Sequence, residues 1–208
     1  MDAMSTFTEA KTELLNFLRT NSVRHGDFVL SSGAQSKYYV DCKRATLDPR
    51  GAWLVGEVMH SIISREAAKA RTKVDAVGGL TMGADPIALA VGMYSHFAKD
   101  CPPLQTFVVR KTPKTHGETK LIEGNFKPGD SVVVIDDVVT KGDSTIKAIE
   151  AVIQAGGKVA FVAALVDRQE GGRHKIEAMG YRVAAAFQRD ELLSTDAKSH
   201  QPADCVAA

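Results

Sequence analysis

Residues 132–145 read VVVIDDVVTKGDST, and this stretch decides the fold. A short apolar run is followed by Asp136 and Asp137, then by a loop that contains Gly142, and then by a segment with helical periodicity. A wholly apolar run of this length indicates a strand buried on both faces, as in a parallel sheet covered by helices. The order strand, acids, glycine loop and helix predicts a binding site at the end of that strand.

Strands and helices alternate on both sides of this stretch. Apolar runs predict strands at residues 28–30, 38–40, 74–77, 106–109, 131–135, 159–166 and 181–185. Apolar residues at helical spacing predict helices at residues 6–20, 49–70, 86–97, 144–155 and 173–179. We therefore expect an α/β fold, in which helices flank a central, mostly parallel sheet.

The chain has 208 residues, which suits a single domain over residues 1–208. Within it, we expect residues 1–45 to form a small N-terminal lobe over the carboxyl edge of the sheet. The small, polar tail at residues 195–208 is predicted to be disordered.

The bulk composition excludes several classes of function. The formal net charge is +1, so no overall field directs the protein to nucleic acid or to a membrane, and any anion site must be local. We find neither a secretory signal nor an apolar run long enough to span a bilayer. The three cysteines, Cys42, Cys101 and Cys205, are scattered and form no CxxC pair. This pattern argues against a disulfide framework or a zinc site and favours a cytoplasmic protein.

Glycines and charged residues follow the ends of the predicted strands. Residues 78–83 read GGLTMG, and later strands are followed by Arg110 and Lys111, by Asp136 and Asp137, and by Asp167 and Arg168. Because ligands of parallel sheets bind beyond the carboxyl ends of the strands, these residues predict a site for a polar, anionic ligand.

The loop at residues 140–145 has the properties of a phosphate site. A helix N-terminus offers free N–H groups and partial positive charge, and Gly142 lets the backbone curl around an anion. Thr140, Ser144 and Thr145 can add hydroxyl donors, and the two preceding acids can accept hydrogen bonds from ribose hydroxyls. Neither a Walker A loop nor a GxGxxG dinucleotide motif is present.

This segment resembles the signature of type I phosphoribosyltransferases, and the similarity extends over residues 23–168. Further stretches resemble orotate phosphoribosyltransferases in particular: residues 28–33 with 38–41, residues 79–86, residues 110–117 and residues 167–172. The resemblance implies a Mg²⁺-dependent transfer of phosphoribosyl from phosphoribosyl pyrophosphate to N1 of orotate. The products would be orotidine 5-phosphate and pyrophosphate, in de novo pyrimidine synthesis.

The resemblance also implies which residues form the site. The expected catalytic residues are Lys114, His116 and Asp137. Orotate would contact Tyr38, Tyr39, Thr140 and Arg168. Phosphoribosyl pyrophosphate would contact Arg110, Lys111, Lys114, His116, Asp136, Asp137, Val138, Val139, Thr140, Lys141, Gly142, Asp143 and Ser144. No protein ligand to a metal is expected, because Mg²⁺ would be held mainly by substrate oxygens.

Residues 111–124 carry several cations between glycines and have little to bury, which predicts a mobile lid. The resemblance implies that this lid closes over the site of a neighbouring subunit, and so implies a homodimer. Some members of the family carry a lysine where this chain has Ser31, so a base contact from that position is not expected here.

Other interpretations remain open on the residues alone. Arg168 presents a planar fork suited to a carboxylate, but it could also form a surface ion pair with Asp167 or Glu170. One of Tyr38 and Tyr39 is expected to face the core rather than the base. The chain could also be a purine phosphoribosyltransferase, which would need no carboxylate clamp. A non-catalytic regulator that binds phosphoribosyl pyrophosphate is the third possibility.

Overall fold

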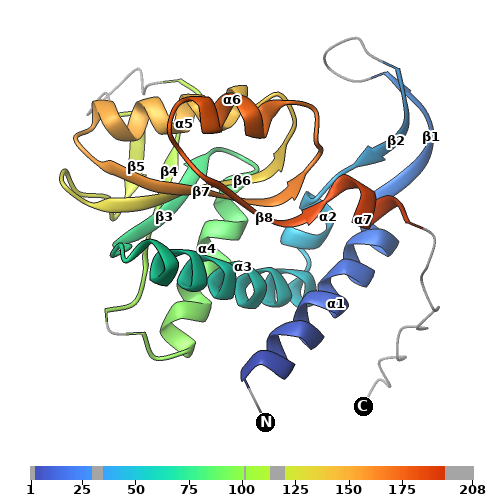
Figure 1. Cartoon of the computed structure of the whole chain (residues 1–208), viewed down its shortest axis with the longest axis horizontal. Helices are drawn as coiled ribbons and strands as arrows, with labels where there is room; N and C mark the ends of the chain where they lie inside the picture. The colour runs from blue at the N-terminus through green and yellow to red at the C-terminus, as the bar shows by residue number, and fades with distance from the viewer. Residues whose placement is uncertain (1–2, 30–34, 101, 113–119, 195–208) are drawn as a thin grey trace.

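The computed structural model describes residues 3–29, 35–100, 102–112 and 120–194 (Figure 1). Within them, the main sheet has the strand order β5-β4-β3-β6-β7-β8. Its strands are β3 (Ala76–Leu80), β4 (Gln105–Val109), β5 (Ile122–Gly124), β6 (Ser131–Val139), β7 (Lys158–Asp167) and β8 (Val183–Gln188). All neighbouring strands are parallel except β5, which runs antiparallel to β4.

Helices cover both faces of this sheet (Figure 1). One face packs against α1 (Ala3–Asn21), α3 (Pro49–Ala70) and α4 (Ala84–Phe97), and the other packs against α5 (Asp143–Gln154) and α6 (Gly172–Ala178). Alternate residues of β6 enter the two cores, with Val133 and Ile135 in the first and Val132 and Val134 in the second. The wholly apolar strands therefore follow from burial on both faces, as expected from the sequence.

The strands β1 (Val23–Val29) and β2 (Gln35–Val40) form a separate antiparallel pair, which lies beside the main sheet (Figure 1). The preceding helix α1 behaves differently, because Leu14 and Leu18 are fully buried in the same core as α3 and the sheet. Within the predicted N-terminal lobe, only the β1–β2 pair thus projects from the main core.

The predicted α/β class, with its small N-terminal lobe, is confirmed. The strand predicted at residues 131–135 was too short, because β6 continues through both acids to Val139. Three elements were not predicted: β5, α2 (Lys43–Thr46) and α7 (Arg189–Leu193). Each is too short to show a periodic pattern. Since residues 122–124 pair with β4, the predicted lid does not extend to residue 124.

Some predictions fall on residues outside those described, namely the tail at 195–208, the central part of the lid at 113–119, and Ser31. In the part of the chain that is described, no helix has both the length and the apolar character needed to cross a membrane.

Candidate active site

The phosphate loop lies between the end of β6 and the start of α5. Gly142 has φ of 82°, and α5 begins directly after it without a side-chain cap. The first N–H groups of α5 are therefore free of side-chain competition for an anion. The loop packs closely against α6, because the N–H of Gly172 donates to the carbonyl of Thr140 at 2.8 Å.

Asp136 turns toward α5. Its Oδ2 accepts hydrogen bonds from Ser144 Oγ at 2.8 Å and from Thr145 Oγ1 at 2.5 Å, and its side chain is almost fully buried. Burial raises the pKa of this carboxyl to about 6, and the charge of Asp137 adds to the rise, although the two hydroxyl donors oppose it. The hydroxyls of Ser144 and Thr145 were expected to donate to a phosphate, but in the structure they donate to Asp136.

Asp137 is supported from the other face of the sheet. Its carboxylate lies so close to Gly83 that a Cβ at that position would come within 2.2 Å of Oδ1. Its Oδ1 also accepts from the N–H of Val138 at 3.0 Å, and its Oδ2 lies 3.8 Å from Lys43 Nζ. Asp137 therefore joins the phosphate loop to the loop after β3.

Lys43 is a site residue that the sequence analysis did not identify. Its Nζ lies 3.4 Å from Asp41 Oδ1 and 3.8 Å from Asp137 Oδ2. Partial burial lowers the pKa of this lysine, but Asp137 and Asp41 together outweigh that effect and raise it. Lys43 therefore stays charged beside the acid pair. The lysine directly follows an acid and a cysteine at the end of β2, but this local pattern does not predict its contact with Asp137.

The neighbouring Cys42 is fully buried. Burial, together with the charge of Asp137, raises the pKa of its thiol well above the usual range. The thiol is therefore a packing group of the core and not a nucleophile.

Arg168 and Tyr38 come together at the end of β7. The Arg168 guanidinium carbon lies 5.2 Å from the centre of the Tyr38 ring, and the arginine side chain is 8% exposed. Among the described residues its Nε has no hydrogen-bond partner. Arg168 forms an ion pair with Glu170 at 2.8 Å. It does not pair with Asp167, because Asp167 pairs with Arg173 at 2.7 Å.

The two tyrosines have different surroundings. Tyr38 packs against the main core as well as Arg168, whereas Tyr39 contacts Phe28 at 5.7 Å between ring centres and lies under Arg24. Of the pair, Tyr38 thus stands beside the buried guanidinium.

The loops after β3 and β4 complete this edge of the sheet. Thr81 Oγ1 donates to Asp85 Oδ2 at 2.6 Å, and the N–H of Thr81 donates to the carbonyl of Val109 at 2.8 Å. Arg110 Nε donates to the carbonyl of Thr112 at 3.3 Å, and Lys111 is exposed. The described ends of β3, β4, β6 and β7 therefore meet as predicted.

The remaining predicted residues occupy varied positions. Val139 is fully buried and its carbonyl accepts from the N–H of Arg168 at 2.9 Å, while Val138 is partly buried. Lys141 is exposed, and Asp143 lies 3.3 Å from Lys175 at the surface. Lys114 and His116 lie outside the described residues. Over the described ranges, no group of three or more His, Cys, Asp or Glu side chains is arranged to hold a metal ion.

Proteins of known identity are similar to this chain in sequence and in fold. No family model matches the chain. An orotate phosphoribosyltransferase of Aquifex aeolicus is 43% identical over 186 residues, which cover 88% of this chain and 97% of that protein. The chain belongs to the orotate phosphoribosyltransferase family. The resemblance found in the sequence is thereby confirmed, and this family member is an enzyme of the glycosyltransferase class.

Solved structures of the family agree in fold. Orotate phosphoribosyltransferase of Mycobacterium tuberculosis H37Rv, in complex with Fe(III) dicitrate, matches with a TM-score of 0.74 and 40% identity over 89% of this chain and 99% of that chain. Its complex with 5-phospho-alpha-D-ribosyl 1-diphosphate matches with a TM-score of 0.67 and 33% identity over 88% and 92% of the two chains.

Proposed function

We propose that this family member transfers phosphoribosyl from phosphoribosyl pyrophosphate to N1 of orotate, in the synthesis of pyrimidine nucleotides. The observation that carries the assignment of the base is Arg168. Its guanidinium is buried beside Tyr38, and among the described residues its Nε lacks a hydrogen-bond partner. A buried donor without a partner is costly, and the carboxylate of orotate would satisfy it with a planar, charge-assisted contact.

The donor would lie along the end of β6. Its 5-phosphate would bind the uncapped N-terminus of α5 at Gly142, and the ribose hydroxyls would donate to Asp136 and Asp137. Asp136 has less free capacity to accept a ribose hydrogen bond, because its Oδ2 already receives hydrogen bonds from two hydroxyl groups. A carboxylate that is held in this way is fixed in orientation, which positions the ribose for attack at C1.

No nucleophilic side chain is required for this transfer. Orotate N1 forms the bond to C1 as the bond from C1 to pyrophosphate breaks; the departing pyrophosphate takes the electron pair, and the N1 proton of orotate is released to water or to the pyrophosphate. Negative charge therefore grows on the leaving group, where cations lower the barrier. Arg110 and Lys111 at the end of β4 are suitable cations to stabilise the charge on pyrophosphate. We assign the same role to Lys114 and His116.

Mg²⁺ is part of this proposal, and the oxygen donors present are of the kind that it prefers. Of the two acids at the end of β6, Asp137 retains some exposure, at 15% for its side chain, whereas Asp136 is almost fully buried. Substrate oxygens would mainly hold the ion, as expected from the sequence, and Asp137 is the acid of the pair with room to add a further contact. When bound, the ion neutralises charge on the pyrophosphate.

We further propose a homodimer in which the lid of one subunit acts in the site of the other. An apolar surface supports it, formed by large exposed side chains on α3 and α4: Trp53, Leu89, Met93 and Phe97. The test mixes a Lys114→Ala variant with an Asp137→Asn variant, each inactive alone. Recovery of activity upon mixing supports a lid that acts across subunits, whereas unchanged inactivity in a proven mixed dimer contradicts it. We also assign the enzyme to the cytoplasm.

The function is tested by base consumption with phosphoribosyl pyrophosphate and Mg²⁺, offering orotate, uracil, adenine, hypoxanthine and guanine separately. We expect orotate alone to be consumed, with release of one pyrophosphate for each orotate. Consumption of a purine would overturn the choice of base. Binding of the donor without any reaction would support the non-catalytic regulator instead.

Arg168 has its own test within this assay. Arg168→Ala should raise the KM for orotate at least tenfold, with a smaller change in the KM for phosphoribosyl pyrophosphate. Arg168→Lys should restore little, because an ammonium group lacks the planar fork. Arg50→Ala is the matched control, since Arg50 pairs with Glu13 at the surface. An unchanged orotate KM in Arg168→Ala would remove Arg168 from the base site.

A further inference from the structure

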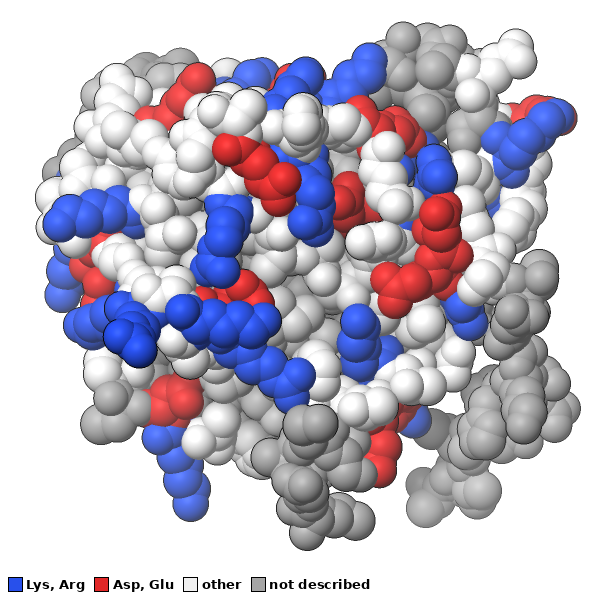
Figure 2. All heavy atoms as spheres, in the orientation of Figure 1, with Lys and Arg blue, Asp and Glu red and all other residues white. Residues whose placement is uncertain are grey.

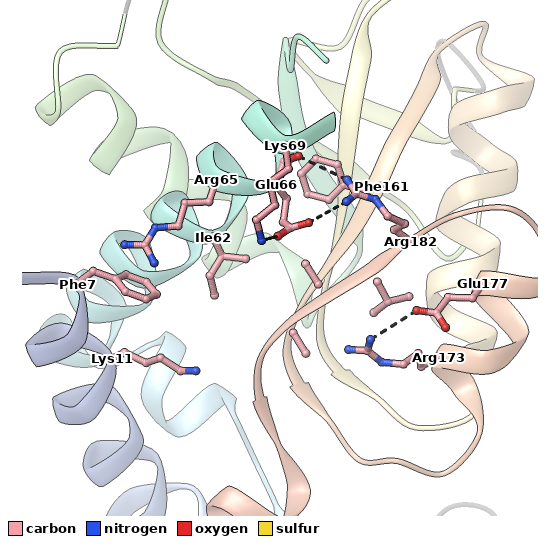
Figure 3. A pocket seen from close by; sticks show the side chains of 13 residues that line it. Phe7, Lys11, Ile62, Arg65, Glu66, Lys69, Phe161, Arg173, Glu177 and Arg182 are labelled. Atoms are coloured by element: carbon pink, nitrogen blue, oxygen red, sulfur yellow. Dashed lines mark hydrogen bonds and ion pairs between the residues drawn. The ribbon is translucent and has the colours of Figure 1, made fainter. Parts of the chain in front are cut away.

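A groove crosses the open edge of the main sheet, away from the predicted active site. Strand β8 ends the sheet, and α1 and α3 flank it on one side while α6 flanks it on the other (Figure 3). The hollow measures about 390 Å³. We call it the edge groove. Its size is that of a site for a small molecule, too small for a long stretch of extended peptide.

The edge groove is more basic than the protein as a whole. Its lining includes two carboxylates, Glu66 and Glu177, and five cations: Lys11, Arg65, Lys69, Arg173 and Arg182. The complete chain, in contrast, has a formal net charge of only +1. Figure 2 shows many Lys and Arg side chains on this face of the molecule, with Asp and Glu side chains among them. A local excess of cations of this kind attracts anions.

Three of these cations are already paired. Glu66 lies 2.6 Å from Lys69 and 3.0 Å from Arg182. Arg173 lies 3.5 Å from Glu177 and also pairs with Asp167 behind the groove. Their charges are therefore partly neutralised, and they form the α6 side and the far end of the groove.

Lys11 and Arg65 differ from the other three, because no carboxylate of the described residues pairs with either. They lie instead over aromatic rings, Lys11 at 5.3 Å from the centre of Phe187 and Arg65 at 3.9 Å from the centre of Phe7. Both come from the α1–α3 side, where Lys11 extends toward the middle of the groove (Figure 3). An anionic group bound at this end would meet Lys11 without displacing any carboxylate, and Arg65, whose guanidinium stacks on Phe7 and points away from the middle of the groove (Figure 3), would add positive charge at the rim.

The floor of the edge groove is apolar and has small side chains. Val183, Ala184 and Ala185 of β8 form it, together with Ile62 and Phe161. Because β8 has no further strand beside it among the described residues, alternate backbone N–H and C=O groups of this strand face outward. A flat heterocycle could therefore lie along the strand edge and form hydrogen bonds with it.

We propose that the edge groove binds a nucleoside phosphate. Its phosphate lies beside Lys11, with Arg65 at the rim on the same side, and its base lies along the β8 edge. The site is separate from the one assigned to the reaction, which lies at the carboxyl ends of β6 and β7. Its existence therefore does not depend on which base the enzyme uses.

The test follows backbone amide NMR shifts of Val183, Ala184 and Ala185 during titration, which report on the groove even if the catalytic site also binds the probe. The probes are AMP, UMP, inorganic phosphate and uridine. We expect saturable shifts with either nucleotide, weaker effects of phosphate alone, and none with uridine. Absence of shifts at millimolar nucleotide would overturn the proposal, as would equal shifts with uridine.

Charge reversal provides the second arm. In the Lys11→Glu/Arg65→Glu variant the nucleotide affinity at these amides should fall at least tenfold. The matched control is Lys99→Glu/Lys127→Glu, which changes the net charge equally at exposed lysines outside the groove and should leave the affinity unchanged. Equal affinities in both variants would contradict the assignment. Retained amide spectra establish that each variant is folded.

Discussion

Replacement of Asp136 by Asn removes a buried charge and keeps the size and shape of the side chain. In the wild-type protein this carboxyl is 8% exposed and accepts hydrogen bonds from Ser144 and Thr145. Those hydroxyls can donate equally to an amide oxygen. The main physical change is therefore the loss of an ionised group from a site where ionisation is unfavourable.

The size and the sign of the effect follow from the pKa. Burial raises the pKa of Asp136 from 3.8 to about 6 in the folded protein. Below pH 3.8 the carboxyl is protonated in both folded and unfolded states, and no penalty arises. Between these values only the folded state keeps the proton, so stability falls as the pH rises. Above pH 6 the full penalty is present, about 3 kcal/mol for this difference in pKa.

The assay is urea unfolding of wild type and Asp136→Asn from pH 4 to pH 8. We expect the free energy of unfolding of the variant, relative to wild type, to increase by about 3 kcal/mol over this range. That corresponds to roughly 2 to 4 °C of melting temperature for each kcal/mol. The control is Asp143→Asn, because the Asp143 side chain is 68% exposed. The free energy of unfolding of this variant relative to wild type should change little between pH 4 and pH 8. If the Asp136→Asn difference is the same at pH 4 and pH 8, the reasoning is refuted.

Three further substitutions test other parts of the structure. Gly142→Ala places a Cβ 3.0 Å from the carbonyl oxygen of Gly172 at a φ of 82°. We expect the free energy of unfolding to fall by about 1 to 2 kcal/mol in urea unfolding. Initial rates should show a KM for phosphoribosyl pyrophosphate at least tenfold higher. Lys43→Met should lower kcat/KM for that donor about tenfold through loss of the cation beside Asp137, with partial recovery in Lys43→Arg; an unchanged value would make Lys43 a bystander. Leu165→Ala empties a fully buried position and should cost about 2 to 5 kcal/mol in urea unfolding, where a change below 1 kcal/mol would contradict the packing.

Most of the fold could be predicted because its elements are long and carry a clear pattern. The helix at residues 49–70 is an example, since Pro49 suits its first turn and Asp48 caps it by accepting from the N–H groups of Arg50 and Gly51. The three-residue strand β5 has no such pattern, because its pairing with β4 is a tertiary contact. Strand β6 was predicted to end at its acids because charge ordinarily marks a strand end, yet hydroxyl donors from α5 stabilise Asp136 inside it.

The candidate site was predictable where its residues directly follow strands of the main sheet. The juxtaposition of Arg168 with Tyr38 was implied by the family resemblance alone, because it depends on how the separate β1–β2 pair lies against the end of β7. Lys43 was missed for a related reason: its partner Asp137 is almost a hundred residues away in sequence. Spacing along the chain contains no information about such contacts.

The two acids of the motif differ in how far along the chain their supporting groups lie. Asp136 relies on Ser144 and Thr145, eight and nine residues later, so its environment forms together with the β6–α5 unit. Asp137 relies on Lys43 and Gly83, which belong to earlier segments and reach it only when the whole chain has folded. An exchange of residues 1–45 between two relatives would therefore alter the surroundings of Asp137 more directly than those of Asp136. Adjacent positions in one motif thus depend on different parts of the chain.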